Sequence, residues 1–187
     1  NELKVYLAAK AKLDNESAPR DELRSVVIGA VTESGLVDNL KGLFNDVTEV
    51  SRQYKEGTMG KTAGFKFSMD QNVTSHTNGT GTADPILINC ANQTGGTLTV
   101  VGLVGNLKAG DTFTIANVYA VNPMSKQSTG QLRQFVVLND VSNAGTSLTI
   151  SPELVATGPT KNITTLPANN APLTFIGGAG SIYELGV

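Results

Sequence analysis

The stretch from Gly110 to Pro152 constrains the fold more than any other part of the sequence. Apolar and polar residues alternate in its outer runs, so it predicts a strand, a polar loop, a second strand, a turn and a third strand. Between residues 112 and 121 one parity is apolar except for Asn117, and it comprises Phe113, Ile115, Tyr119 and Val121. Residues of one parity lie on one face of a strand, so this set predicts a buried face.

Similar short runs occur before and after this stretch, with glycine-containing turns expected at residues 94–96, 108–111 and 143–145. The expected strands are Ile86–Cys90, Leu98–Val104, Thr112–Val121, Leu132–Asp140 and Thr146–Ser151, with weaker candidates at Ile163–Leu166 and Leu173–Ile176. This spacing predicts a small antiparallel barrel or sandwich. The glycine-rich segment 177–180 is expected to be flexible.

The first 70 residues combine helical and strand signals. Residues 1–13 have a helix-forming composition, with a narrow apolar stripe of Leu3, Tyr6 and Leu7. The strongest helical pattern follows, and its apolar face comprises Leu36, Leu40, Leu43, Phe44 and Val47. We expect Ser34 to cap this helix and residues 48–56 to form a second helical segment. Short strands are expected at Ser25–Ile28 and Gly64–Met69, which makes the fold class α+β.

Charge divides the chain into two parts. Residues 1–70 hold 21 charged side chains, and residues 71–187 hold only 9. The segment 71–85 is rich in Asn, Thr and Gly and is typical of a linker, so we expect two modules, 1–80 and 81–187. The net charge of −2 gives no large basic field for nucleic acid. No apolar run reaches the ~20 residues of a membrane helix, no signal peptide is recognised, and the start at Asn1 suggests an excised piece.

His76 is the only histidine and Cys90 the only cysteine. A cysteine hydrolase needs a histidine beside the thiol and an orienting carboxylate, for which Asp84 is the nearest candidate in sequence. No nucleophile motif surrounds these residues. We therefore expect a solvated or hydrogen-bonded His76 and a Cys90 that is a small buried strand residue. A hydrolase that uses Cys90 and His76 stays an alternative.

Other chemical motifs are incomplete. Gly60-Lys61-Thr62 lacks the glycine that a phosphate-binding loop needs at position 55, which is Lys55. The adjacent acids Asp21 and Glu22 do not converge on one bond, so they do not indicate a glycosidase. With one histidine and one cysteine, the usual zinc ligands are too few. Four Asn-x-Thr triplets fit the glycosylation pattern by chance, at Asn72, Asn78, Asn92 and Asn162. We expect no catalytic, cofactor-binding or metal-binding residues.

Two longer segments resemble a known family. In the first, a strand and helix from Leu23 onward lead to Tyr54-Lys55-Glu56-Gly57 and to the strand start Ala63-Gly64-Phe65. In the second, residues 107–152, a Gly-Asp strand start leads through a polar loop and a β-rich strand to LTISP. The order resembles major coat proteins of tailed double-stranded DNA phages, of the podovirus type with a β-barrel inserted in the capsid fold. Residues 173–187 resemble the exit from that insert.

The resemblance implies that residues 1–80 form a peripheral and axial part of the capsid fold and that residues 81–187 form a Greek-key-like antiparallel barrel. It implies a non-enzymatic head-shell subunit whose partners are copies of itself and, during assembly, scaffolding and portal proteins. Packaged DNA is an indirect partner only, and no membrane or small-molecule partner is expected. The protein would assemble in the bacterial host cytoplasm and reside in the virion.

Two further expectations accompany this resemblance. We expect the barrel to act as a folding nucleus and brace, because an inserted β-domain can fold autonomously. In the best-known relative a long charged barrel loop contacts neighbouring capsomers, whereas the matching turn here, Asn89–Gly96, is short and uncharged. The alternative from another class is a carbohydrate- or protein-binding β-domain of another phage or surface structure. The sparse aromatic residues argue against carbohydrate binding.

Overall fold

The computed structural model describes residues 2–21, 23–40, 60–83 and 85–185. The chain divides into two compact units. The N-terminal unit comprises Asn1–Ser75 together with Glu184–Val187, and the barrel unit comprises His76–Tyr183. The chain therefore leaves the N-terminal unit, forms the barrel, and returns.

The N-terminal unit contains a three-stranded sheet and two helices. The elements are α1 (Glu2–Asn15), β1 (Ser25–Ile28), α2 (Ala30–Leu40), β2 (Lys61–Thr62) and β3 (Phe65–Met69). The central strand β3 pairs in parallel with β1 and antiparallel with β2. The predictions for the first helix and for both strands agree with these elements within two residues.

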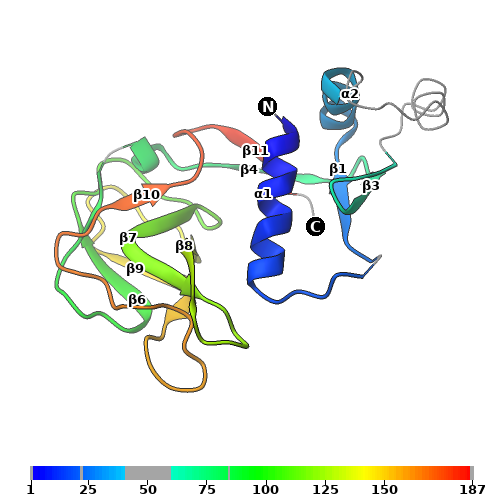
Figure 1. Cartoon of the computed structure of the whole chain (residues 1–187). Coiled ribbons are helices and arrows are strands. Elements are labelled where there is room, and N and C mark those ends of the chain that lie inside the picture. Colours follow the sequence, from blue (N-terminus) through cyan, green and yellow to red (C-terminus); the bar gives the residue numbers. More distant parts are fainter. Residues whose placement is uncertain (1, 22, 41–59, 84, 186–187) are drawn as a thin grey trace. The chain divides into compact units, whose positions relative to one another are not determined.

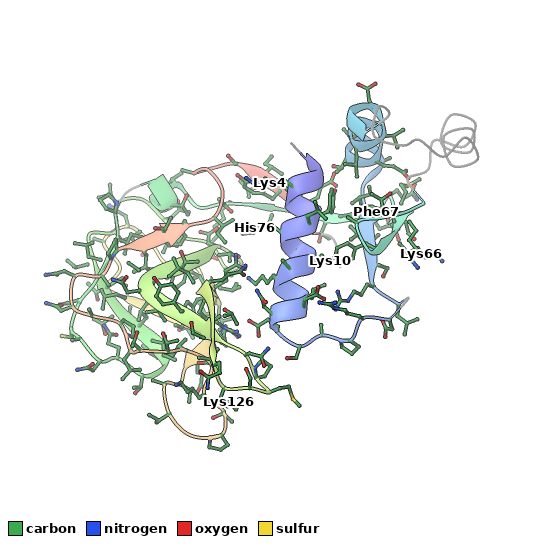
Figure 2. The ribbon with its side chains drawn as sticks, viewed as in Figure 1. Lys4, Lys10, Lys66, Phe67, His76 and Lys126 are labelled. Carbon is green, nitrogen blue, oxygen red and sulfur yellow. The ribbon has the colours of Figure 1, made fainter. Side chains whose placement is uncertain are left out.

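A small core holds this unit together. Its buried members are Ile28, Leu36, Phe65 and Phe67. Tyr6 packs edge-on against Phe67, with ring centroids 5.1 Å apart, so α1 covers one face of the sheet. Along β3, Phe67 is buried and its neighbour Lys66 is exposed, as alternation requires (Figure 2). Leu7, predicted to share the stripe of Tyr6, is half-exposed.

Helix α2 begins earlier than the sequence suggested. The carbonyl of Gly29 accepts the first helical hydrogen bond, from the N–H of Glu33 at 2.9 Å, which makes Gly29 the capping residue. Ser34 lies inside the helix, and its hydroxyl donates to the carbonyl of Val31 at 2.8 Å. The prediction that Ser34 caps the helix is therefore wrong. The expected helical positions 41–56 lie outside the described residues.

The barrel unit is a six-stranded antiparallel sheet in the order β10–β7–β8–β9–β6–β5. Figure 1 labels the strands β6, β7, β8, β9 and β10. The strands are β5 (Leu87–Ile88), β6 (Gly95–Val101), β7 (Thr112–Val121), β8 (Ser128–Val137), β9 (Ser147–Leu154) and β10 (Leu173–Phe175), and a 3-10 helix, η1, spans Thr80–Ala83. The two edges meet, because the N–H of Ile88 donates to Ala171 and that of Leu173 donates to Ile86. The sheet is thus a nearly closed barrel, and the predicted fold class is confirmed.

The barrel encloses one continuous core. Phe113 lies at its centre, with ring centroids 5.8 Å from Phe135 and 5.3 Å from Phe175. The other buried members come from every strand and from three connections: Ile86, Ile88, Leu98, Val100, Leu103, Leu107, Ile115, Val118, Val137, Leu148, Ile150, Leu154, Ile163, Ala171 and Leu173. Inward and outward side chains alternate along β6 and the first half of β9, as the sequence predicted for Leu148 and Ile150.

A bulge in β7 reverses part of the predicted pattern. Asn117 has a φ of +63°, and the β7–β8 register shifts between Thr114 and Tyr119. The extra residue turns the following side chains to the opposite faces, so Val118 is buried and Tyr119 is 37% exposed. Tyr119 was predicted to be buried with Phe113, and that prediction is wrong. Val121 is buried as predicted.

Several boundaries also differ from the prediction. Two strands lie in segments expected to be irregular, β4 (Thr74–Thr77) in the linker and β11 (Ile182–Leu185) beyond the glycine-rich tail, and they pair with each other. The expected strand Ile163–Leu166 is reduced to a single bridge between Ile163 and Ala120. Strands β6 and β8 begin three and four residues earlier than predicted, because Gly95 and Ser128 still pair across the sheet.

Candidate functional site

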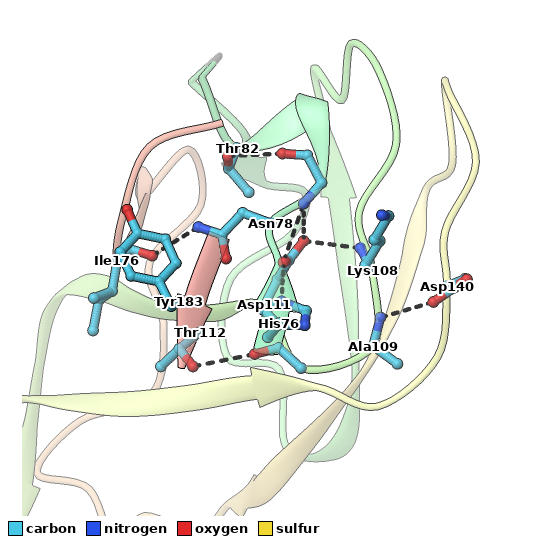
Figure 3. A network of polar contacts seen from close by, with 12 residues as sticks. His76, Asn78, Thr82, Lys108, Ala109, Asp111, Thr112, Asp140, Ile176 and Tyr183 are labelled. Atoms are coloured by element: carbon cyan, nitrogen blue, oxygen red, sulfur yellow. Dashed lines mark hydrogen bonds and ion pairs between the residues drawn. The ribbon is translucent and has the colours of Figure 1, made fainter. Parts of the chain in front are cut away.

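The candidate site is a buried polar network where the chain enters and leaves the barrel (Figure 3). We call these two segments, residues 76–82 and 176–183, the neck. The buried polar residues among those described are Asp111, with 0% exposure, and Asn78, with 5% exposure. Asn78 belongs to the neck, and Asp111 forms hydrogen bonds with it. A buried polar side chain is costly unless it is hydrogen-bonded, so the partners of these two residues define what the network does.

The carboxylate of Asp111 has hydrogen-bond partners in three directions. Nε2 of His76 lies 2.9 Å from its Oδ1. The backbone N–H of Gly79 lies 3.2 Å from each carboxylate oxygen, and that of Lys108 donates to Oδ2 at 2.8 Å. Two of the three partners belong to the neck, so Asp111 fastens the incoming chain to the start of β7.

The turn before β7 positions this carboxylate. The N–H of Asp111 donates to the carbonyl of Lys108 at 3.0 Å, and the side chain of Asp111 accepts from the N–H of Lys108 in return. Gly110, between them, has a φ of +104°. A Cβ atom at Gly110 would lie 3.0 Å from the ring of His76, so glycine also provides the room that the imidazole occupies.

The incoming chain continues in close contact with the turn at residues 105–107. A Cβ atom at Gly79 would lie 2.2 Å from the carbonyl oxygen of Asn106, so no side chain fits at that position. The hydroxyl of Thr80 donates to Oδ1 of Asn106 at 2.6 Å, and the N–H of Gly81 donates to the carbonyl of Asn106 at 2.9 Å. Residues 79–81 are therefore fixed by both backbone and side-chain contacts.

Asn78 ties the incoming segment to the outgoing one. Its side-chain amide donates to the carbonyls of Ile176 at 3.1 Å and Gly178 at 3.2 Å, and its backbone N–H donates to Ser181 at 3.0 Å. The hydroxyl of Tyr183 accepts from the N–H of Gly178 at 2.8 Å. Hydrogen bonds of Asn78 to three residues of the outgoing chain therefore join the two halves of the neck.

The contacts of His76 and Cys90 do not support the hydrolase alternative. His76 contacts Asp111, a carboxylate that the sequence did not single out. Cys90 is exposed with a φ of +83°, and its N–H donates to Asn169. The prediction of a buried strand cysteine is wrong, because β5 ends at Ile88 and the chain then turns. No described contact joins Cys90 to His76, and Asp84 lies outside the described residues.

The remaining sequence candidates have local structural roles. Lys61–Thr62 is strand β2 and turns back into β3, so Gly60-Lys61-Thr62 is a hairpin rather than a phosphate-binding loop. Asp21 accepts from the N–H of Leu23, and Glu22 lies outside the described residues. Asn72 and Asn92 are exposed, whereas the amides of Asn78 and Asn162 are engaged with backbone carbonyls.

Three other features concern the part of the chain that the structure describes. It holds no group of three or more His, Cys, Asp or Glu side chains that could bind a metal ion. None of its helices has the length and apolar character needed to cross a membrane. The turn Asn89–Gly96 is held by Gln93, whose side chain bridges the carbonyls of Asn89 and Thr99.

Asp111 is the functional residue that the sequence reasoning missed. It appeared only as the last residue of a predicted turn, at residues 108–111. The available signal was its place directly before the best strand, in a module with very few charges. An isolated acidic residue directly before a core strand can be buried when backbone N–H groups donate hydrogen bonds to its carboxylate.

Comparison with known proteins identifies the barrel. The sequence model of the family described as "P22 coat protein - gene protein 5" matches residues 89–181. Among solved structures, one described as "CUS-3 coat protein I-domain" is similar, with 29% sequence identity and a TM-score of 0.37. The match covers 50% of this chain and 95% of that one. No curated protein sequence matches the chain significantly.

The family match runs from the loop after β5 to the outgoing half of the neck, and so includes every long strand of the barrel. The family match includes residues 107–152, and it therefore confirms their resemblance to phage major coat proteins. The chain carries the inserted β-barrel domain of a phage major coat protein, in which residues 89–181 match the P22 coat protein family.

Proposed function

We propose that this chain is a self-assembling subunit of an icosahedral phage head shell, in which the barrel folds by itself and braces the subunit. The coat protein family implies a structural role in the capsid and association with copies of itself. The observation that supports the finer proposal is the barrel with its own core and a neck whose two halves are bonded to each other.

The distribution of core residues supports autonomous folding. The barrel core has 17 buried apolar residues, against 4 in the described part of the N-terminal unit. Each fully buried Val, Leu, Ile or Phe contributes roughly 1.5–3 kcal/mol of favourable transfer free energy. The barrel therefore has a larger apolar core than the described part of the N-terminal unit, and we infer that it forms first and restricts the chain on both sides of it.

The close approach of the two halves of the neck supports the proposal that the barrel is inserted into another domain. The N–H of Asn78 lies 3.0 Å from the carbonyl oxygen of Ser181, so the two ends of the barrel are adjacent. A domain with adjacent ends can be placed in a surface connection without separating the elements on either side. On this basis we place the first boundary of the two predicted modules near residue 76 instead of 80, with residues 184–187 returning to the first module.

The partners in this proposal are other coat subunits and, during assembly in the bacterial cytoplasm, scaffolding and portal proteins. The protein acts by shape and surface contacts, without catalysis. Packaged DNA is an indirect partner, because a net charge of −2 provides no general attraction to phosphates. The carbohydrate- or protein-binding alternative stays a prediction, and a glycan-binding screen tests its first half.

The test compares the complete coat protein with a variant in which residues 79–180 are replaced by a short Gly-Ser linker. The adjacency of Asn78 and Ser181 makes a short linker sufficient. Both proteins are expressed with their scaffolding protein, and the products are separated by sedimentation and viewed by negative-stain electron microscopy. We expect closed shells from the complete protein, and insoluble or unassembled protein from the variant.

Two results would count against the proposal. Absence of shells or shell fragments from the complete protein contradicts the role as a shell subunit. Equal yields of soluble protein and of shells from the variant contradict the bracing role of the barrel. A matched control carries Tyr119→Ser, which removes an exposed aromatic ring from the barrel wall and leaves its core and neck intact. It separates loss of the barrel from a change at its surface.

A further inference from the structure

The strand that leaves the barrel carries a carboxylate that contacts the start of helix α2. Oε2 of Glu184, in β11, accepts a hydrogen bond from the backbone N–H of Gly29 at 3.1 Å. The two residues are 155 positions apart in the chain. Gly29 is the capping residue of α2, since its carbonyl accepts the bond from Glu33 that opens the helix.

Helix α2 has no side chain of its own at this position. Gly29 occupies the capping position but has no side chain that could accept a hydrogen bond, and the third helical residue, where a glutamate would reach back to the N–H of Gly29, is Thr32. Glu184 provides the missing acceptor for the N–H of Gly29, and it adds a second negative charge at the positive end of the helix, whose first turn already contains Glu33. The residue that completes the start of α2 thus follows the barrel in the sequence, whereas α2 itself precedes the barrel.

The missing side chain at Gly29 is part of this contact. A Cβ atom there would lie 2.7 Å from Oε1 of Glu184 and 3.1 Å from its Cδ. The carboxylate therefore occupies the space that a side chain would fill. A glycine at the capping position weakens an isolated helix start only slightly, but here it makes α2 dependent on a distant residue.

A series of contacts connects Glu184 with the buried network. Asp111 holds His76, which lies in β4, and β4 pairs with β11, which carries Glu184. We infer that Glu184 is a folding latch, by which helix α2 is completed only after the barrel has formed and the chain has returned in β11. The inference rests on the proposed autonomous folding of the barrel and specifies how that folding is transmitted to the N-terminal unit.

The first test measures amide hydrogen exchange of the whole chain by mass spectrometry. Glu184→Ala should increase the exchange of the protected α2 amides about fivefold, the effect of losing one capping interaction. Glu184→Gln keeps an acceptor and loses the charge, so a smaller increase of about twofold is expected. Peptides from β7 and β8 should exchange as in the unmodified protein. Glu153→Ala, which removes an exposed carboxylate from β9, is the matched control and should leave α2 unchanged.

The second test is a double-mutant cycle. His76→Ala removes the contact with Asp111, and it should accelerate exchange in β4, β11 and α2. In the Glu184→Ala background it should accelerate β4 and β11 but add nothing at α2. If His76→Ala prevents folding, His76→Gln, which keeps a donor in a more flexible side chain, replaces it in the cycle.

Each outcome decides the inference. Unchanged α2 exchange in Glu184→Ala overturns the capping role. An effect of His76→Ala on α2 that is equal with and without Glu184 overturns the latch, because the coupling then takes another route. The proposed function fails separately, when the barrel does not fold alone or shells do not form, and neither result depends on α2 exchange.

Discussion

The two units of the chain obtain their stability in different ways. The barrel unit concentrates buried apolar residues in one core, and the only carboxylate buried among its described residues is hydrogen-bonded to the neck. The described part of the N-terminal unit has a small core and places charged groups in contact with each other. This difference supports the proposal that the barrel is a self-sufficient domain, whereas the described part of the N-terminal unit is held largely by ion pairs and by contacts with distant parts of the chain.

The ion pairs of the N-terminal unit converge on Asp14, at the end of α1. Its carboxylate contacts Arg24 at 2.8 Å, Arg20 at 3.0 Å and Lys10 at 3.8 Å. The guanidinium of Arg24 also donates to the backbone carbonyls of Ala18 and Pro19. The loop between α1 and β1 is therefore held by charge-assisted hydrogen bonds instead of by apolar packing.

The largest contrast is expected from removing one aromatic ring in each unit. Phe113→Ala should lower the free energy of unfolding of the barrel by about 3–5 kcal/mol, because the cavity lies between Phe135 and Phe175. Phe67→Ala removes the partner of Tyr6 and should leave the barrel transition unchanged. Urea unfolding followed by near-ultraviolet circular dichroism measures both. A barrel equally destabilised by either change contradicts the independence of the two units.

A smaller effect is expected at the neck. Asp111→Asn keeps the shape of the side chain but turns an amide group toward the N–H of Gly79 or Lys108. Leaving a buried donor without an acceptor costs about 1–3 kcal/mol, so the barrel should lose stability of this order. Asp140→Asn is the matched control, since Asp140 is exposed and accepts one bond, from Ala109 at 2.8 Å. Equal urea midpoints for the two variants would show that the buried network contributes nothing.

Acidification should affect the contacts of Asp14 in the N-terminal unit. The hydrogen bond from Arg24 and the charges of Arg24 and Arg20 hold the pKa of Asp14 below its ordinary value of 3.8. The stabilisation from Asp14 is therefore complete above that ordinary value and is lost as the pH falls through the lowered pKa. Amide exchange of residues 15–24 should therefore increase at acid pH. Asp14→Asn should remove this pH dependence, and its persistence in that variant would assign it to another group.

The sequence predicted the strands with clear alternation and failed where a single residue changes the geometry. Ser25–Ile28 and Thr112–Val121 were located to the residue, because apolar residues and turn signals delimit them. Tyr119 was placed on the wrong face, since nothing in the composition of β7 reveals that Asn117 adopts a positive φ. Strands β4 and β11 were missed because each is short, and it is their mutual pairing that stabilises them.

The candidate site was not predictable from local sequence for a similar reason. Asp111 and His76 lie 35 positions apart, and Glu184 lies 155 positions from Gly29. Contacts between positions so far apart leave no signal in a local sequence pattern. The family resemblance of residues 107–152 did locate the inserted domain, because it depends on the order of a strand start, a loop and a closing strand within one continuous segment.

Unfolding of the isolated barrel tests the central claim most directly. Residues 76–183, expressed alone, should give native-like near-ultraviolet circular dichroism and one cooperative thermal transition, close to that of the barrel in the whole chain. Residues 89–181, which lack His76, Asn78 and the buried Ile86 and Ile88, should not unfold cooperatively. A fragment 76–183 with no cooperative transition would contradict the account of the barrel as a self-sufficient domain.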